Sequence, residues 1–209
     1  MTMPIVVLDL ETTGLDILTV DPIEIGMLCI TVDDDQIAEG PTFEALIPCP
    51  PIATWETGAA KMHSDSGLAD LAETRSTSPV AAMEMRDDRR AVEQQALAWL
   101  DRVAGPGEVL ACGNNVGRFD LVILRRTMPQ LAARFFYRAL DVSALKVAGV
   151  SLGWWREPPK VKTHRALEDC RASVAELRYY HQRARRRTSA GDWCGLDCGG
   201  ADPDCEVHS

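Results

Sequence analysis

The apolar positions in the first fifty residues fall into three strand-like runs, near residues 4–11, 23–32 and 38–48. The runs are rich in β-branched residues, and acidic or Gly-Pro turns separate them, so they predict three strands joined as a meander. A fourth strand over 109–112 and a short fifth strand over 139–142 are predicted further along the chain.

Helical periodicity alternates with the later strands. An amphipathic helix is predicted over 84–103, and shorter helices are predicted near Phe119 and over 143–148. A long helix from about 163 to 187 is predicted by the apolar stripe of Leu167, Cys170, Val174 and Leu177.

The stretch 50–82 is rich in Pro, Ser, Thr and Gly. It is predicted to be a loop that holds at most short helices, around 61–71. Strands first and helix–strand alternation later predict an α/β domain with a mixed sheet.

Two acids interrupt the apolar first run, which reads IVVLDLETTGLD over residues 5–16. Side chains alternate along a strand, so Val7, Asp9 and Glu11 share one face. A carboxylate without a partner is costly in a buried strand. The two acids therefore indicate either turn caps with Arg partners or a divalent cation, and a cation needs further acids.

Two further acids stand near the starts of predicted helices. Asp120 follows the fourth strand, and Asp169 lies early in the last helix. Each alone is typical of an acid that the helix dipole stabilises. With Asp9 and Glu11 they form a set of four carboxylates from three separate segments.

His164 lies five residues before Asp169. Five residues of regular helix turn about 500°, which leaves these two side chains about 140° apart. They can face one centre only if His164 sits in an irregular first turn, for which Lys162-Thr163 offers a cap. The alternative is a hydrogen-bonded surface or core histidine.

Composition indicates one cytoplasmic domain. The chain has 209 residues and is 46% hydrophobic, which is enough for one substantial core. No apolar run is long enough to span a membrane, and the N-terminus does not resemble a secretory leader. Four cysteines scattered in apolar segments are typical of reduced core thiols: Cys29, Cys49, Cys112 and Cys170.

Charge limits the kind of substrate. The net charge is −9, but residues 188–209 hold five acids and no Lys or Arg, so residues 1–187 carry −4. Two divalent ions would balance that charge, and the chain lacks a long basic face for a duplex. Local phosphate contacts are available to Arg125, Arg126, Arg134, Arg138, Lys160, Lys162 and Arg165. A short or end-bound substrate is favoured.

These motifs together resemble the DEDD 3′–5′ exonucleases, in the branch whose last motif carries His (DEDDh), and within it the oligoribonucleases. The motifs are DLETTGLD over 9–16, CGNNVGRFD over 112–120 and HRALEDCRASVAELRYY over 164–180. The likeness extends over about residues 4–182. It implies a ribonuclease H-like fold, with a mixed five-stranded sheet flanked by helices.

The resemblance implies phosphodiester hydrolysis with two divalent cations. Mg²⁺ or Mn²⁺ suits such carboxylate ligands. By resemblance, Asp9 bridges both ions, Glu11 and Asp169 complete one, and Asp120 supports the other. His164 is the expected general base that takes a proton from the attacking water.

Further residues resemble those that hold the substrate. Leu15, Trp55 and His63 resemble residues that wedge against or stack on the terminal bases. Trp55 is also a candidate for core or loop packing, because its spacing to His63 is longer than in the family. Arg138 and Ser143 resemble the pair that caps the phosphate.

The segments 128–131 and 136–146 resemble a dimer and phosphate-binding region. A homodimer is therefore expected, with Tyr137 reaching the neighbouring active site. The alternative is that Phe135 and Phe136 are core residues and Tyr137 is an ordinary strand residue.

The second motif departs from the oligoribonuclease pattern. Asn115, or else Asn114, occupies the position of the substrate-binding Asn. The Ser that follows it in the family is then Val116 or Asn115, so it is absent either way. The Phe119-Asp120 pair resembles the form found in DNA-proofreading relatives. The departures weaken the expectation of a strict dinucleotide preference.

The chain is predicted to divide into an exonuclease domain over 1–187 and an acidic tail over 188–209. The tail has few large apolar residues and is predicted to be disordered. It also carries four possible Zn²⁺ ligands, namely Cys194, Cys198, Cys205 and His208, in a spacing that matches no established pattern.

The predicted function is that of a cytoplasmic 3′–5′ exoribonuclease that degrades the 3′ ends of short single-stranded RNA to nucleoside 5′-monophosphates. A DNA 3′–5′ exonuclease for proofreading or repair is the alternative. A catalytically silent nucleic-acid-binding adaptor is a third class, which the complete set of five catalytic positions disfavours.

Overall fold

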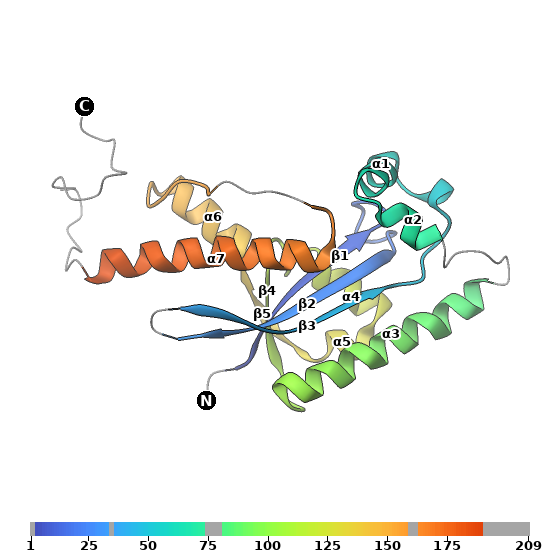
Figure 1. Ribbon diagram of the computed structural model, residues 1–209, viewed down its shortest axis with the longest axis horizontal. Helices are drawn as coiled ribbons and strands as arrows, with labels where there is room; N and C mark the ends of the chain where they lie inside the picture. The colour runs from blue at the N-terminus through green and yellow to red at the C-terminus, as the bar shows by residue number, and fades with distance from the viewer. Residues whose placement is uncertain (1–2, 34–35, 74–80, 159–162, 190–209) are drawn as a thin grey trace.

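The computed structural model describes residues 3–33, 36–73, 81–158 and 163–189 (Figure 1). Among the described residues, no helix is long and apolar enough to cross a membrane. Most of the predicted tail, with its four candidate Zn²⁺ ligands, lies outside these ranges, as do Lys160 and Lys162.

One mixed five-stranded sheet forms the centre of the molecule, in the order β3-β2-β1-β4-β5. β1 pairs antiparallel with β2, and β2 pairs antiparallel with β3, which confirms the predicted meander. β4 runs parallel to β1, and β5 runs parallel to β4. The strands span Ile5–Thr12 (β1), Pro22–Val32 (β2), Ile37–Leu46 (β3), Val109–Gly113 (β4) and Phe135–Asp141 (β5).

The two longest helices, α3 and α7, lie on opposite sides of this sheet (Figure 1). The α-helices span Thr57–Asp65 (α1), Leu68–Glu73 (α2), Ala81–Ala104 (α3), Asp120–Thr127 (α4), Pro129–Ala132 (α5), Val142–Ser151 (α6) and Ala166–Ser189 (α7). A short 3₁₀ turn, Ile52–Thr54, precedes α1. The predicted α/β class is confirmed.

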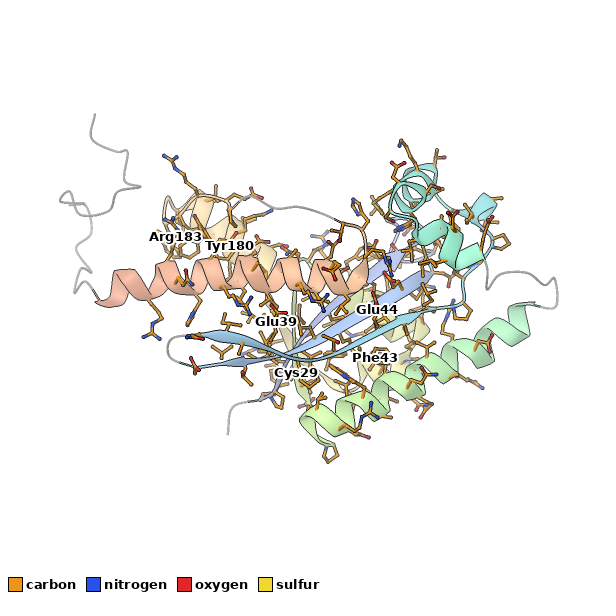
Figure 2. The ribbon with its side chains drawn as sticks, in the orientation of Figure 1. Cys29, Glu39, Phe43, Glu44, Tyr180 and Arg183 are labelled. Carbon is orange, nitrogen blue, oxygen red and sulfur yellow. The ribbon has the colours of Figure 1, made fainter. Side chains whose placement is uncertain are left out.

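The alternation of side chains along β1 divides the core into two clusters. Leu8 and its in-phase neighbours on β1 pack against α3, α4 and α5, in a cluster that also holds Trp99. Figure 2 shows Phe43 of β3 on this side, where its ring contacts Trp99. Val7, which is out of phase with Leu8, packs against Cys170 and Val174 of α7. Asp9 is in phase with Val7, so the acids of β1 lie on the α7 side of the sheet.

α1 and α2 form a smaller cluster beside the end of β1. Leu68 and Trp55 pack with Ile23, at the start of β2. Because Pro22 pairs with Thr12, this cluster lies next to the residues that follow the acids of β1.

Among the differences from the sequence predictions are those at β5, α5 and α7. β5 begins at Phe135, four residues before the predicted start, because Phe135 already pairs with Val109. The four-residue helix α5 was not predicted, although its first residue is Pro129, which favours a helix start. α7 begins at Ala166 rather than near Thr163, because His164 has a φ of 55° and lies outside the helical conformation.

Candidate active site

β1 and β4 separate at the level of the first acidic motif. Their pairing covers Ile5 to Val7, whereas β1 continues to Thr12. Beyond the pairing, the carboxylate of Asp120 accepts a hydrogen bond from the backbone N–H of Leu10, at 2.8 Å. This bond fixes the start of α4 at the end of β1, with Asp120 beside Asp9 and Glu11.

α7 reaches the same strand end from the other side. Gly26 of β2 pairs with Asp9, and a Cβ atom on Gly26 would lie 2.5 Å from the carbonyl carbon of Ala166. The absence of a side chain at Gly26 lets the first turn of α7 lie directly on the sheet. Asp169, in that first turn, therefore comes next to Glu11.

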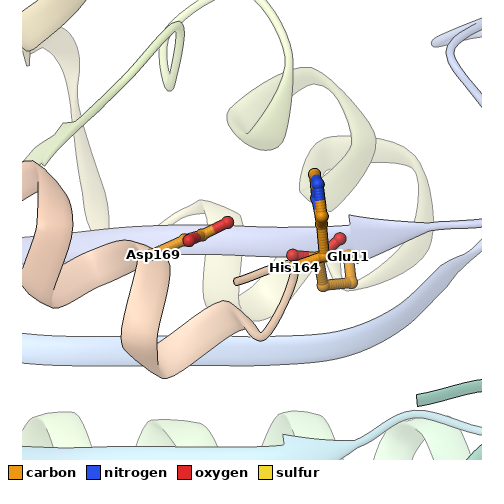
Figure 3. A group of neighbouring side chains, drawn as sticks. All are labelled: Glu11, His164 and Asp169. Atoms are coloured by element: carbon orange, nitrogen blue, oxygen red, sulfur yellow. The ribbon is translucent and has the colours of Figure 1, made fainter. Parts of the chain in front are cut away.

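The structure brings together Glu11, His164 and Asp169 beside β1 (Figure 3). One potential ligand atom from each residue lies within 4.8 Å of those of the other two. His164 precedes the helix, with φ at 55°, so the expected irregular first turn is confirmed. In a regular helix, the side chains of His164 and Asp169 would instead point about 140° apart.

Neighbours on both sides hold the His164 segment. Thr163 donates hydrogen bonds from its backbone N and its Oγ1 to Oδ1 of Asp169, at 3.3 and 3.2 Å. The backbone N of Ala166 donates to Glu24 of β2, at 2.9 Å. The first backbone N–H of α7 is therefore satisfied by Glu24; of the predicted cap, Thr163 contacts Asp169 and Lys162 lies outside the described residues.

Burial and electrostatic repulsion together act on the acids of the site. Glu11 is only 6% exposed, and its pKa is raised to about 9, first by burial and then by the negative charges of Asp9, Asp169, Glu24 and Asp120. Burial and the charge of Asp9 also raise the pKa of Asp120. A divalent cation fits this donor set, because hard oxygen ligands with excess negative charge favour such an ion.

His63 lies next to Glu11, and Trp55 packs against His63. The ring of His63 is buried, its Nε2–H donates to the carbonyl oxygen of Thr12 at 2.9 Å, and its Nδ1 lies 3.8 Å from Oε2 of Glu11. Trp55 is 7% exposed, and its indole N–H donates to the carbonyl oxygen of Pro50. The two rings meet edge to face at 5.8 Å between centroids. Both residues are packed in this structure, and their contact with bases stays a prediction.

Asp141, at the N-cap of α6, brings two of the predicted substrate residues together. Its Oδ1 accepts hydrogen bonds from the backbone N of Ser143 at 2.9 Å and of Asn115 at 3.1 Å. Asn115 is exposed with a φ of 59°. Asn114 instead turns inward, where Ser143 Oγ donates to its amide oxygen and its amide nitrogen donates to Ser173 and Glu176.

The remaining predicted substrate residues lie on exposed segments. Leu15, in the loop after β1, is 79% exposed, and its backbone N donates to the carboxylate of Glu56 at 3.0 Å. On β5, Tyr137 is 69% exposed, and the guanidinium of Arg138 lies 5.1 Å from the centroid of its ring. Phe135 is a core residue, as in the alternative interpretation of this segment.

Several basic residues considered for phosphate contacts have protein partners. Arg134 donates to Asp101 and to the carbonyl oxygen of Gly107, and Arg126 donates to the carbonyl oxygen of Val20. Arg165 pairs with Glu24. Glu24 was not predicted as a site residue, although a single acid within the apolar run PIEIGMLCI, residues 22–30, is a signal of the same kind as Asp9.

Known proteins resemble this chain in sequence and in fold. The family model described as exonuclease matches residues 6–177. The oligoribonuclease of Dichelobacter nodosus is 35% identical, over 84% of this chain and 92% of its own length. That of Alkalilimnicola ehrlichii is 37% identical, over 88% of this chain and 91% of its own. The structure of Escherichia coli exonuclease I in complex with a 5cy-dT13 oligonucleotide has a TM-score of 0.64 at 13% identity; the match covers 91% of this chain and 43% of that one.

Replacing Glu11 by Gln is expected to stabilise the cation-free protein at high pH. Because its folded-state pKa of about 9 lies above the ordinary value of 4.5, the folded protein keeps a proton that the unfolded chain releases in this range. The stability that this proton contributes is fully present below the unfolded-state pKa of 4.5, and it is lost as the pH rises towards the folded-state pKa of about 9. In excess chelator, the melting temperature of Glu11→Gln should therefore exceed that of the parent protein increasingly across this window.

The exposed acid Glu108 offers a control. Glu108→Gln should give the same pH dependence of melting as the parent protein. A Glu11→Gln advantage that is independent of pH, or that grows as the pH falls, would contradict the repulsion described for this site.

Proposed function

The chain belongs to the exonuclease family, as an oligoribonuclease-like nuclease, and we propose that it removes nucleoside 5′-monophosphates from the 3′ ends of short single-stranded RNA. The observation that carries this proposal is the convergence of Asp9, Glu11, Asp120, His164 and Asp169 at the end of β1. These residues come from β1, α4 and the segment that opens α7.

Asp9, Glu11, Asp120 and Asp169 are the residues that would hold two divalent cations. Bound there, Mg²⁺ or Mn²⁺ would supply an activated water and would neutralise the charge that develops on the leaving oxygen. The carboxylate donors favour these ions over Zn²⁺, which prefers Cys and His. The raised pKa of Glu11 supports this assignment, since a cation would offset both the burial of this carboxylate and the repulsion by its acidic neighbours.

His164 would accept the proton of the attacking water. It is half-buried and adjoins Glu11 and Asp169, which supports a position of its imidazole beside the attacking water. An imidazole can both accept and release a proton, which suits the role of general base.

The substrate is proposed to be a short single strand. Leu15 presents an exposed apolar side chain for the terminal bases, and Asn115, Arg138 and Ser143 would receive the phosphate. Trp55 and His63 would complete the base pocket after a local rearrangement, since both are buried here. The net charge of −4 over residues 1–187 favours a small substrate held at its end.

The chain is further proposed to act as a homodimer in the cytoplasm. Tyr137 is exposed on the edge strand β5, with Arg138 stacked on its ring, and such side chains anchor two-fold interfaces. The four described cysteines are free thiols, as a reducing compartment would keep them.

A DNA 3′–5′ exonuclease stays the alternative, because the Phe119-Asp120 pair departs from the oligoribonuclease pattern. Turnover of labelled two-, five- and twenty-nucleotide RNA and DNA by the purified protein distinguishes these activities. Faster cleavage of the twenty-nucleotide DNA than of the short RNA would favour the DNA exonuclease over the exoribonuclease.

Asp9→Ala and Asp169→Ala are each expected to abolish turnover, because each removes a ligand that no neighbouring side chain replaces in position. Activity should also require added Mg²⁺ or Mn²⁺. The measurement is the release of nucleoside monophosphate from a labelled dinucleotide. Asp88→Ala, which removes an exposed acid of α3, is the control and should retain full activity. Full activity in excess chelator would contradict the metal-dependent mechanism.

His164→Ala is expected to lower turnover by about 10²–10⁴-fold while cation binding is nearly unchanged, because a general base moves a proton and holds no ion. Calorimetric titration with Mn²⁺ measures the binding. His181→Ala on α7 is the control. If His164→Ala and Asp169→Ala weaken cation binding equally, His164 is a ligand instead.

Assembly is expected to limit the substrate length. If Tyr137 closes the neighbouring site, light scattering at micromolar concentration should show a dimer, and cleavage should slow as the RNA lengthens. Tyr137→Ala should weaken the dimer and reduce the dependence of the cleavage rate on RNA length. Val32→Ser, at an exposed apolar position on β2, should change neither property. A monomer that cleaves a twenty-nucleotide strand at an undiminished rate would exclude this assembly.

A further inference from the structure

His164 occupies a conformation that its own backbone does not favour. Its φ of 55° lies in the left-handed region, which residues with a side chain adopt only when their surroundings hold them there. Thr163 is bonded to Asp169 on one side of His164. The residues on the other side, Arg165 and Ala166, are bonded to Glu24.

The Glu24 carboxylate is saturated by this segment. Glu24 is fully buried within β2. Arg165 donates to it from Nε, at 3.1 and 3.2 Å, and from Nη2, at 2.8 Å. The backbone N of Ala166 adds a fourth bond at 2.9 Å. A guanidinium that binds one carboxylate through two nitrogens fixes direction as well as distance.

The neighbouring strand strengthens this attachment. Arg165 also lies 3.5 Å from the carboxylate of Glu44 on β3, which Figure 2 labels beneath the N-terminal end of α7. Gly26, two residues after Glu24, is in contact with the backbone of Ala166. Residues 165 and 166 are therefore held against β2 and β3, and His164 has little freedom to relax.

We propose that the Glu24–Arg165 ion pair is a positioning device for the imidazole of His164. This inference rests on the proposed role of His164 as general base. Neither Glu24 nor Arg165 touches the reacting atoms; their effect passes through the backbone of residues 164–166. Loss of the pair lets His164 leave the left-handed conformation, so its imidazole departs from the position where it meets the water. Displacement of a catalytic group by about 1 Å costs on the order of 10²-fold in rate.

Arg165→Gln tests the proposal, since it removes the charge and the paired bonds while leaving the helix cap at Ala166. It should lower kcat by about 10- to 100-fold, with KM unchanged. Arg165→Lys should recover only part of kcat, because an ammonium cannot form the two-nitrogen contact. Glu24→Gln, if it folds as judged by circular dichroism, should act in the same direction.

A double-mutant cycle separates positioning from a structural effect. In the His164→Ala background, Arg165→Gln should cause no further loss of kcat, because the group it positions is already missing. Arg178→Gln is the matched control, since Arg178 also joins α7 to the sheet, through Glu39 of β3, about 18 Å along the helix. It should leave kcat unchanged in both backgrounds.

The outcomes distinguish this inference from the proposed function. If His164→Ala has little effect on kcat, the general-base assignment fails, and the positioning proposal fails with it. If His164→Ala lowers kcat strongly, but Arg165→Gln lowers kcat further in the His164→Ala background, only the positioning proposal is overturned. A raised KM with unchanged kcat in Arg165→Gln would overturn it too, and would make Arg165 a contact of the substrate phosphate.

Discussion

The mutual repulsion of carboxylates at the end of β1 is the constraint on which the rest of the structure depends. Asp9 and Glu11 leave the sheet where β1 and β4 part, and Asp120 and Asp169 reach them from two helices. Such a cluster opposes folding, as the raised pKa of Glu11 indicates. The core must therefore hold it together from both faces of the sheet, with Leu8 packed towards α3 and Val7 packed towards α7.

Most of the sheet and of the acid cluster could be predicted from the sequence, because both depend on local periodicity. The alternation along β1 placed Asp9 and Glu11 on one face, and the turn angle of a helix required an irregular residue at His164. Other features depend on contacts between distant segments. The start of α7 at Ala166 is set by Glu24, which is 142 residues away in sequence, and no local pattern around Thr163 encodes that bond.

The burial of the predicted substrate-binding residues could not be predicted from the sequence, because exposure at the rim of a site depends on neighbouring loops. Trp55 belongs to the α1–α2 cluster and the buried His63 packs against it, whereas Leu15 and Tyr137 are exposed. The Asn114-Asn115 pair shows the same difficulty. The amide of Asn114 turns inward to Ser173 and Glu176, and Asn115 takes the exposed, left-handed position. These contacts, together with the hydrogen bond from the backbone N of Asn115 to Asp141, distinguish the two residues.

The carboxylates and the His164 backbone are both unfavourable for the folded chain, and they lie within one small volume. Strain of this kind persists only where the surrounding structure holds it, and it concentrates at functional sites. A ligand that binds the folded state alone adds to its stability by mass action. A divalent cation at Glu11 and Asp169 would therefore offset the repulsion when it binds. The Glu24–Arg165 pair needs no cation, so the protein can hold His164 in place before the site is filled.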